Sequence, residues 1–325
     1  MTNFKCQYPN CDCAISFPDG YKPSVATECP KSVTCFQYDD LINKTLYEQT
    51  RKQIVTHIHD LIEEQTIKKF PAEHRNHLGA SVIGDNCSRR LWYSFRWCKL
   101  EQFEGRMRRL FDRGNQEEAK FIELLRSIGF TIWEVDPDTG KQFRIYGIEG
   151  HFGGSGDSKA LMPWFPDMPI LLEFKTHNTK SFCHLVANTL KLSKPQHYNQ
   201  ICIYSYKFKL KYCLYCAINK NDDDLYFELI EADWNLAQQL ENKAYDIINS
   251  QIPLPKISEH SSYFDCKFCS FNGICHHNEE VDKNCRSCKF SKPIEEANWF
   301  CTKHNQIIPN NAISQSWSCH VSINI

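Results

Sequence analysis

The sequence lacks both a long apolar run and an apolar leader behind its first residue. No segment approaches the roughly 20 consecutive apolar residues that a membrane-spanning helix needs. The residues after Met1 are polar and aromatic, unlike the short apolar stretch that directs secretion. We therefore expect a cytoplasmic protein that has no membrane partner.

An excess of charge of one sign is also lacking, because the formal net charge is −1. Overall charge therefore does not attract nucleic acid, and any such contact has to come from local clusters of basic residues. The sequence has no internal repeat, no low-complexity tract and no phosphate-binding loop of the form G-x-x-x-x-G-K-[ST]. We therefore do not expect a built-in helicase motor.

Cysteine, in contrast, is abundant, with 18 in a chain of 325 residues. A chain of this length does not need disulfides to hold a core. The cysteines that lie inside apolar or aromatic segments are expected to be small buried side chains. The others cluster near the two ends, and in a reducing cytoplasm this clustering indicates metal binding. The cysteines expected in the core are Cys98, Cys183, Cys202, Cys213 and Cys216.

The spacing of apolar residues predicts a single core with smaller appendages. The period is near 3.6 in the first third of the chain and then changes to 2, and Gly and Pro separate the segments. The expected elements are helices over 36–70, from Asp85 or Asn86 to Phe95, and over 112–128, strands over 130–135, 142–149, 155–162 and 169–175, two helices, strands over 211–219 and 224–230, and a helix over 232–250. This order predicts an α/β core with a mixed central sheet flanked by helices.

Local signals predict how some of these helices begin and end. Asp85 or Asn86 is suited to cap the second helix, and Ser193 to cap the helix with Pro195 in its first turn. Gly129 is suited to end the helix over 112–128. The buried face of that helix is expected to hold Ala119, Phe121, Ile122, Leu124 and Leu125.

An apolar strand over 170–175 ends in two charged residues, Glu173 and Lys175. Because side chains alternate along a strand, the two lie on one face. Buried charges are costly unless they pair or bind a metal. Asp157 lies 16 positions earlier, on the preceding predicted strand, after glycines that permit the close approach of a ligand or another backbone.

These residue types suit a hard cation such as Mg²⁺, which prefers oxygen ligands and usually takes one or two carboxylates. Asp157 and Glu173 can supply carboxylates, and the backbone carbonyl of Phe174 a third oxygen. Such a metal activates water and neutralises charge on a phosphate. Lys175 could orient the attacking water or stabilise the developing negative charge.

Asp157 with Glu173-Phe174-Lys175 resembles the D…(E)-x-K signature of PD-(D/E)XK nucleases. The segment from Gln200 to Tyr204 resembles the Q-x-x-x-Y helix of their RecB-like branch, which contacts the DNA end. The segment from Arg113 to Glu118 resembles that branch's first motif, with Glu118 as the expected ligand and Glu117 as the alternative. The resemblance covers roughly residues 85–230 and implies that Glu118, Asp157, Glu173, Lys175, Gln200 and Tyr204 form the active site and that His197 also faces it.

Each part of this pattern also has an ordinary interpretation. Glu173 and Lys175 could form an edge-strand ion pair, and Asp157 could occupy a turn. Glu117 and Glu118 taken singly suit a solvated helix face. Gln200 and Tyr204 could be a packing pair one helical turn apart. All of these would have to hold together for the nuclease hypothesis to be wrong.

Three cysteines, Cys266, Cys269 and Cys275, are spaced too closely to be independent core residues. Cys87 is the candidate fourth thiolate. One upstream and three downstream cysteines around a nuclease core resemble the iron-sulfur nucleases, namely the AddB-type subunit and the RecB-like nucleases of CRISPR adaptation. The resemblance implies a structural [4Fe–4S] cluster, which we favour, although four thiolates also suit Zn²⁺.

A second group resembles a zinc ribbon, with a Cys-x-x-Cys pair followed by later cysteines. The expected Zn²⁺ ligands are Cys285, Cys288, Cys301 and Cys319, and His304 or His320 could replace one of the later two. A further cluster near the N-terminus suggests another zinc module, but its spacing matches no family. Its members are Cys6, Cys11, Cys13, Cys29 and Cys35.

Two basic groups flank the predicted site, as phosphate contacts should. Three aromatic residues near the first group, Trp92, Trp97 and Phe103, could stack on bases, although such residues usually belong to a core. The first group is Arg89, Arg90, Arg96, Lys99, Arg106, Arg108, Arg109 and Arg113, and the second is Lys191, Lys194, Lys207, Lys209 and Lys211.

The sequence thus predicts four segments: a cysteine-rich segment over 1–35, a PD-(D/E)XK core over 36–252, an iron-sulfur segment over 253–280 and a zinc-ribbon-like module over 281–325. The resemblance implies a DNA exonuclease dependent on Mg²⁺ or Mn²⁺, by analogy in phage or viral recombination or repair. A helicase or single-strand-annealing protein would be a partner. The alternatives are a structure-specific endonuclease and a catalytically silent DNA-binding scaffold.

Overall fold

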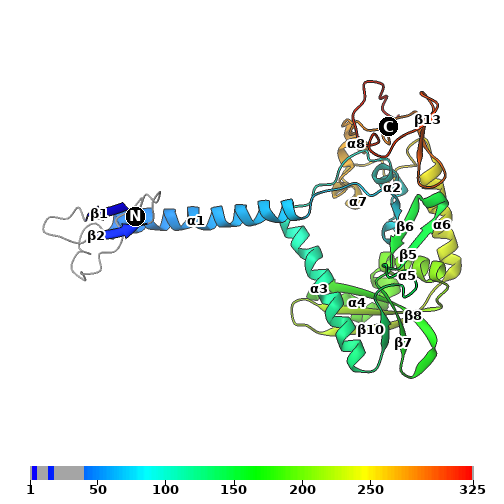
Figure 1. Cartoon of the computed structure of the whole chain (residues 1–325), viewed down its shortest axis with the longest axis horizontal. Coiled ribbons are helices and arrows are strands. Elements are labelled where there is room, and N and C mark those ends of the chain that lie inside the picture. The colour runs from blue at the N-terminus through cyan, green and yellow to red at the C-terminus, as the bar shows by residue number, and fades with distance from the viewer. Residues whose placement is uncertain (1, 6–13, 18–39, 324–325) are drawn as a thin grey trace. The chain divides into compact units, whose positions relative to one another are not determined.

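We analysed a computed structural model, and the structure describes residues 2–5, 14–17 and 40–323 (Figure 1). The chain divides into two units, Met1–Gln65 and Thr66–Ile325. In the first unit, β1 (Thr2–Lys5) and β2 (Ala14–Phe17) pair antiparallel, and α1 (Asp40–Lys69) begins. The five cysteines predicted to form an N-terminal zinc module lie outside the described residues.

The second unit is built on a five-stranded mixed sheet of order β10-β9-β8-β7-β4. Within this sheet only β8 and β9 pair parallel, and a parallel pair needs a long crossover connection. The helices α4 (Thr179–Ser193) and α5 (Pro195–Phe208) supply this crossover. The strands are β4 (Thr131–Trp133), β7 (Ser158–Met162), β8 (Phe165–His177), β9 (Tyr212–Asn219) and β10 (Leu225–Glu231).

Alternation along β8 and β9 gives this sheet two different faces. One face packs Leu172 and Phe174 against Phe121 of α3 (Gly105–Ser127). The opposite face carries Leu171 and Tyr215 and packs against α5, which in turn packs against α6 (Trp234–Asn249). Figure 1 shows α3 on one side of the sheet and α5 and α6 on the other.

A second, three-stranded sheet joins the large one at the proposed site. It consists of β3 (Leu78–Gly79), β6 (Phe152–Ser155) and β5 (Arg144–Gly147). The chain leaves β6 and enters β7 through only two residues, Gly156 and Asp157. The single strand predicted over 155–162 is therefore divided between two sheets.

The cysteine-rich end packs on the same unit. The short helices α7 (Phe264–Lys267) and α8 (Asn272–His277) are followed by an antiparallel sheet of β11 (Ser291–Pro293), β12 (Trp299–Cys301) and β13 (Gln306–Ile307). Buried residues of this end, among them Phe271 and Trp299, belong to the same hydrophobic core as α5 and α6. The predicted boundaries at 252/253 and 280/281 stay predictions.

Several local predictions were wrong. The helix α2 (Ser88–Phe95) is capped by Cys87, because Asp85 is occupied by the Cys87 backbone N–H and by Arg90. Ser193 is the last residue of α4, and α5 begins after Lys194 with no side-chain cap.

The predicted buried face of the third helix was partly wrong. In α3, Ala119 and Leu124 are exposed, because the buried stripe follows Glu117, Phe121, Ile122 and Leu125. Gly129 follows the end of α3 with a φ of +96°, a conformation that favours glycine.

In the described part of the chain, no helix is both long enough and apolar enough to cross a membrane. The two α-helices with more than 20 residues, α1 and α3, both have a polar average composition.

Candidate active site

Asp157 lies at the point where the chain passes from the small sheet to the large one. Ser158 pairs with Leu172 across β7 and β8, so the antiparallel register continued by one residue places Asp157 opposite Glu173. The backbone N–H of Phe174 donates a hydrogen bond to Oδ2 of Asp157 at 3.1 Å. The structure therefore brings together the two predicted carboxylates and the Phe174 backbone.

Glu173 is almost fully buried, with 1% of its surface exposed. Lys175 forms an ion pair with its Oε1, and Gln200 Nε2 donates a hydrogen bond to the same oxygen at 2.7 Å. A buried carboxylate without such partners would be strongly destabilising. The predicted Glu173, Lys175 and Gln200 thus form one set of contacts between β8 and α5.

Glu118 approaches the same place from α3, on the other side of the sheet. Burial, and then the neighbouring Asp157 carboxylate, raise the pKa of Glu118 to about 7, while the Lys175 charge opposes this rise. Glu117, the alternative, is buried and pairs with Lys120 at 3.0 Å and Arg113 at 3.8 Å. Glu118 is therefore the residue of this pair that lies near Asp157.

The carboxylates of this cluster hold protons more tightly than isolated ones. Burial raises the pKa of Glu173 to about 7, which Lys175 opposes and Asp157 supports. Burial also raises the pKa of Asp157. For Lys175, burial acts to lower the pKa, but Glu173 and Asp157 outweigh it and the pKa is raised. A cation that replaces the protons bound to these carboxylates would reduce the repulsion between their negative charges.

Tyr204 reaches the site from α5 and accounts for a glycine that precedes Asp157. Tyr204 is buried, and a Cβ atom on Gly154 would overlap its hydroxyl group. A Cβ on Gly156 would lie 2.8 Å from Cε2 of Phe208, also on α5. The glycines therefore admit side chains of α5, where the sequence predicted a ligand or a backbone segment.

The predicted residues of α5 share one stripe of that helix. His197, Gln200 and Tyr204 are spaced by three and four residues, which places them on one face. His197 Nδ1 lies 2.9 Å from the Tyr215 hydroxyl oxygen. Burial, and then the Lys175 charge, lower the pKa of His197 to about 3, so its imidazole is neutral.

The basic and aromatic groups predicted to contact nucleic acid are only partly accessible. Arg96 and Arg108 are buried, and Trp92 and Trp97 belong to the core. Arg96 donates to carbonyls of the cysteine-rich end, and Arg108 donates to the carbonyls of Phe103 and Pro71. These four side chains are therefore not available to DNA as placed. Phe103 remains 40% exposed.

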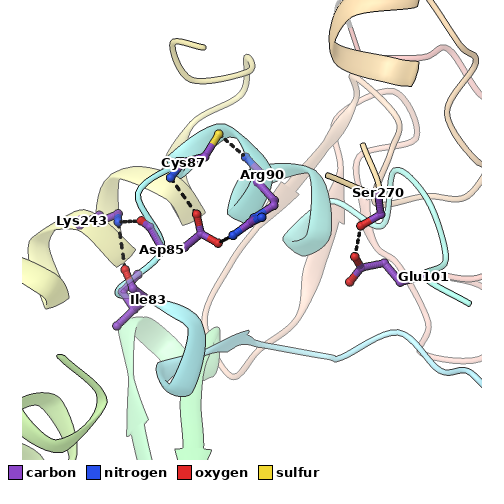
Figure 2. A network of polar contacts seen from close by, with 7 residues as sticks. All are labelled: Ile83, Asp85, Cys87, Arg90, Glu101, Lys243 and Ser270. Atoms are coloured by element: carbon purple, nitrogen blue, oxygen red, sulfur yellow. Dashed lines mark hydrogen bonds and ion pairs between the residues drawn. The ribbon is translucent and has the colours of Figure 1, made fainter. Parts of the chain in front are cut away.

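The four cysteines of the predicted iron-sulfur site line one cavity, beside Arg89 and Arg90. Cys87 is fixed by the hydrogen bond from its N–H to Asp85 at 2.8 Å, and Lys243 of α6 binds the carbonyls of Ile83 and Asp85 (Figure 2). Burial raises the pKa of Cys266, Cys269 and Cys275, and the nearby Cys87 sulfur raises it further.

The four cysteines of the predicted zinc ribbon line a separate cavity of about 330 Å³. Burial, and then Cys288, Cys301 and Cys319, raise the pKa of Cys285 to about 11. His304 and His320 line the same cavity, and His320 Nε2 lies 3.1 Å from the Ser287 hydroxyl oxygen. Among the residues described, however, no three His, Cys, Asp or Glu side chains are arranged to hold a metal ion.

Two buried arginines lie next to the cysteines of the predicted zinc ribbon, and their charges affect whether those cysteines could bind a metal ion. Arg286, between Cys285 and Cys288, and Arg96 are almost inaccessible, and neither forms an ion pair within the described ranges. Nε and Nη2 of Arg286 and Nε of Arg96 have no hydrogen-bond partner. Four thiolates around a divalent ion carry a net charge of 2 − 4 = −2, which would offset the two guanidinium charges. The residue types that line this cavity would suit a tetrathiolate site, but their side chains are not arranged around an ion in the described part of the chain.

The sequence did not indicate several residues that complete these sites. Tyr215 and His177 extend the contacts of His197, but as single residues in an apolar strand and at a strand end they carry no pattern. Lys243 comes from a helix about 160 residues away from Cys87 in sequence. Arg286 lies between two predicted ligands and could have been noticed there.

Comparisons with known proteins give distant structural similarities. No protein-family model matches the chain, and no curated protein sequence matches it. The crystal structure of the protein SSO0001 is 15% identical and has a TM-score of 0.40, covering 67% of this chain and 96% of its own.

An alkaline exonuclease, LHK-Exo from Laribacter hongkongensis, is 18% identical and has a TM-score of 0.41, covering 57% of this chain and 90% of its own. The same enzyme in complex with dAMP has a TM-score of 0.37 at 18% identity, covering 53% and 86%. Similarity at this level does not establish the activity of this chain, which has to be argued from its own residues.

Proposed function

We propose that this protein is a metal-dependent deoxyribonuclease of the PD-(D/E)XK type that hydrolyses phosphodiester bonds from DNA ends. The observation that carries the proposal is the buried contact set of Glu173, Lys175 and Gln200 beside Asp157. A structural ion pair would not need a third carboxylate, yet Glu118 lies near enough to Asp157 for their charges to interact. Perturbed carboxylates that converge in this way are typical of catalytic sites.

The residues of the chain have separable tasks in this mechanism. Gln200 holds the Glu173 carboxylate in one orientation, and the Phe174 N–H does the same for Asp157. Lys175 keeps its positive charge and can hold the attacking water or the developing charge on phosphorus. Bound at Asp157, Glu173, the Phe174 carbonyl and Glu118, Mg²⁺ or Mn²⁺ would supply positive charge at the phosphate and make a water molecule more acidic.

The preference for ends rests on the Q-x-x-x-Y resemblance of Gln200 and Tyr204, whose side chains approach Glu173 and Gly154. A helicase or annealing partner in recombination or repair would supply strand separation. The test is cleavage of end-labelled linear DNA and of circular DNA, with Mg²⁺, Mn²⁺ or EDTA. We expect metal-dependent loss of linear DNA alone, and Asp157→Asn should slow it by at least about 100-fold.

The neighbouring glutamates of α3 provide a matched control. Glu118→Gln should lower the cleavage rate strongly, because Glu118 lies near Asp157. Glu117→Gln changes a carboxylate that pairs with Arg113 and Lys120, so the rate should stay near the wild-type value. Cleavage of circles would indicate the endonuclease alternative, and DNA binding without any cleavage would indicate the scaffold.

We propose that the two cysteine groups hold structural metals: an iron-sulfur cluster at Cys87, Cys266, Cys269 and Cys275, with zinc as the alternative, and zinc at the second group. The common cavity supports the first site, and the unpaired Arg96 and Arg286 support the second. Purified protein should be brown and contain iron, sulfide and zinc. Cys269→Ser should remove the colour. Cys183→Ser should not, because Cys183 is exposed, contrary to the prediction that it lies in the core. Colourless protein containing only zinc would exclude the cluster.

A further inference from the structure

A continuous chain of hydrogen bonds runs beside the candidate active site. Ser181 Oγ lies 2.9 Å from Nδ1 of His177, and Nε2 of His177 lies 2.9 Å from the Tyr215 hydroxyl oxygen. The same oxygen lies 2.9 Å from Nδ1 of His197. Four side chains from α4, β8, β9 and α5 are therefore joined by three contacts of hydrogen-bond length.

Two proton arrangements place the hydroxyl proton of Tyr215 within this series of hydrogen bonds when both rings are neutral. The Tyr215 hydroxyl has one proton and can donate it to only one of the two histidines, so the other must donate to the Tyr215 oxygen. In the first arrangement, Tyr215 donates to His177, His177 donates to Ser181, and His197 donates to Tyr215. In the second, every one of these bonds is reversed.

The two arrangements differ in what His197 offers at its second nitrogen. In the first, Nε2 of His197 has no proton and can accept one; in the second, Nε2 carries a proton and can donate it. Within the described residues no hydrogen bond to this nitrogen is found, and the nitrogen is not among the fully buried atoms that lack a partner. It is therefore free to meet water or substrate.

The end of this hydrogen-bond series at His197 lies near the residues of the proposed active site. His197 lies one turn before Gln200, which binds Glu173, and on the same stripe of α5. Tyr215 is the register partner of Glu173 on the neighbouring parallel strand, and paired residues project from the same face. Glu173, Lys175 and His177 alternate along that face of β8. The outer end, Ser181, is half-buried in the first turn of α4.

The charges around both rings keep them neutral. Burial, and then Lys194, Lys175 and Lys220, lower the pKa of His177 to about 4. For His197, burial is followed by Lys175, His177 and Lys194. These lysines come from β8, from the N-terminal end of α5 and from the turn after β9. A neutral ring has one donor and one acceptor nitrogen, as a relay requires.

We infer that His197, Tyr215, His177 and Ser181 form a proton relay that removes the proton of the attacking water from the active site, an inference that rests on the proposed nuclease function. The O–H bond of the water breaks as its oxygen bonds to phosphorus, and its proton goes to Nε2 of His197. The Nδ1 proton of His197 passes to Tyr215, the hydroxyl proton of Tyr215 passes to His177, and the Nδ1 proton of His177 passes to Ser181. Ser181 releases its own proton to solvent, so one proton enters the relay and one leaves it.

Tyr215→Phe interrupts the relay with the smallest change in packing. In single-turnover cleavage of linear DNA with Mg²⁺, we expect the rate to fall by about 100-fold, the lower end of what a positioned proton-transfer group contributes. DNA affinity should change little, and the variant should stay folded at the assay temperature although the loss of two buried hydrogen bonds lowers its melting temperature. Tyr212→Phe is the matched control, because Tyr212 is on the same strand and packs in the core of the opposite face. It should cleave at the wild-type rate.

A second variant separates proton transfer from support of the fold. His197→Ala should be slow and should regain activity with added imidazole. Across a series of substituted imidazoles, the regained rate should depend on the basicity of the imidazole, as proton transfer requires. Ser181→Ala, at the outer end, should be slowed as well.

The outcomes distinguish the relay from the proposed function. Wild-type protein that never cleaves DNA would refute the nuclease function, and the relay with it. Active wild type with a Tyr215→Phe variant of equal rate would refute the relay alone. Rescue of His197→Ala that ignores imidazole basicity would mean that His197 only packs, which would also overturn the relay.

Discussion

At the scale of single residues, Glu173 places a carboxylate inside a sheet, which lowers the stability of the fold unless the charge is paired. Its contacts explain how the fold tolerates it. Lys175 and Gln200 satisfy one oxygen, whereas Asp157 and Glu118 add negative charge. Glu118 and Glu173 therefore keep protons up to near neutral pH, and a cation bound beside these carboxylates and Asp157 would favour their ionisation.

This coupling predicts that stabilisation by Mg²⁺ grows with pH. The pKa of Glu118 and of Glu173 rises from 4.5 to about 7 on folding, so between these pH values the folded chain keeps protons that the unfolded chain has lost. The metal-free protein thus loses the stability contributed by these groups as pH rises through this window. Above it, Mg²⁺ binds carboxylates that are already ionised. Each kcal/mol of binding should raise the melting temperature by about 2–4 °C.

The measurement is the difference in melting temperature with and without Mg²⁺, at about pH 5.5 and about pH 8. The difference is needed because His177 and His197 have lowered pKa values in the folded protein. Their contribution to the stability of the fold therefore decreases as the pH falls below 6.5, opposite to that of Glu118 and Glu173. Asp157→Asn should abolish the gain at both pH values. A gain that is equal at both would contradict the raised pKa values.

Element scale. The helix α2 joins the two cysteine groups to the core. Cys87 caps its N-terminus, and Arg96 at its C-terminal end donates to the carbonyls of Cys288 at 2.9 Å and Ser291 at 3.0 Å. Arg286 inserts between Trp97 and Trp299, with its guanidinium carbon 4.4 Å and 4.5 Å from the two ring centroids. Two cations thus connect the β11–β13 sheet to the core.

Replacing Arg286 should therefore release the β11–β13 sheet from the core. Arg286→Ala removes hydrogen bonds to the carbonyls of Arg75 and Asn76 and opens a cavity beside Trp299, for a cost of about 2–4 kcal/mol. Trp299, now 2% exposed, should become accessible, and its fluorescence should shift to longer wavelength. Lys289→Ala, at an exposed cation three residues away, should leave the fluorescence unchanged. An unshifted spectrum for Arg286→Ala would mean that the arginine does not hold the sheet.

Whole-molecule scale. All residues of the two described hydrophobic cores lie in the second unit, as do all the proposed active-site residues. The carboxylates of the proposed active site come from α3, from the junction of two sheets and from β8, and α5 supplies a hydrogen bond to Glu173. The second unit therefore contains every side chain of the proposed site.

We accordingly expect residues 66–325 to fold and cleave DNA without residues 1–65. The fragment should retain the melting temperature and the cleavage rate of the full chain within about twofold, because no described core contact is lost. Thermal unfolding and the linear-DNA assay measure both. A fragment that folds but no longer cleaves would assign the first unit a role in catalysis or DNA binding, and an unfolded fragment would show that the units depend on each other.

The sequence by itself indicated a mixed α/β fold, the order of the main elements up to residue 250, and which charged side chains share a face of their strand or helix. Alternation along 170–175 placed Glu173 and Lys175 on one face, and helical spacing placed Gln200 and Tyr204 on one stripe, because both follow from backbone geometry. Helix limits were predicted less well where the predicted capping side chain binds other groups, as Asp85 does before α2.

Only the tertiary structure decided which residues meet across elements. It chose Glu118 over Glu117, because the rotation of α3 against the sheet fixes which glutamate lies near Asp157. It buried Trp92, Trp97 and Arg96, which the sequence alone left available for DNA. It also joined Ser181, His177, Tyr215 and His197, whose separations in sequence carry no periodic signal. Such contacts depend on how sheets and helices pack, and that packing is a property of the whole chain rather than of any segment.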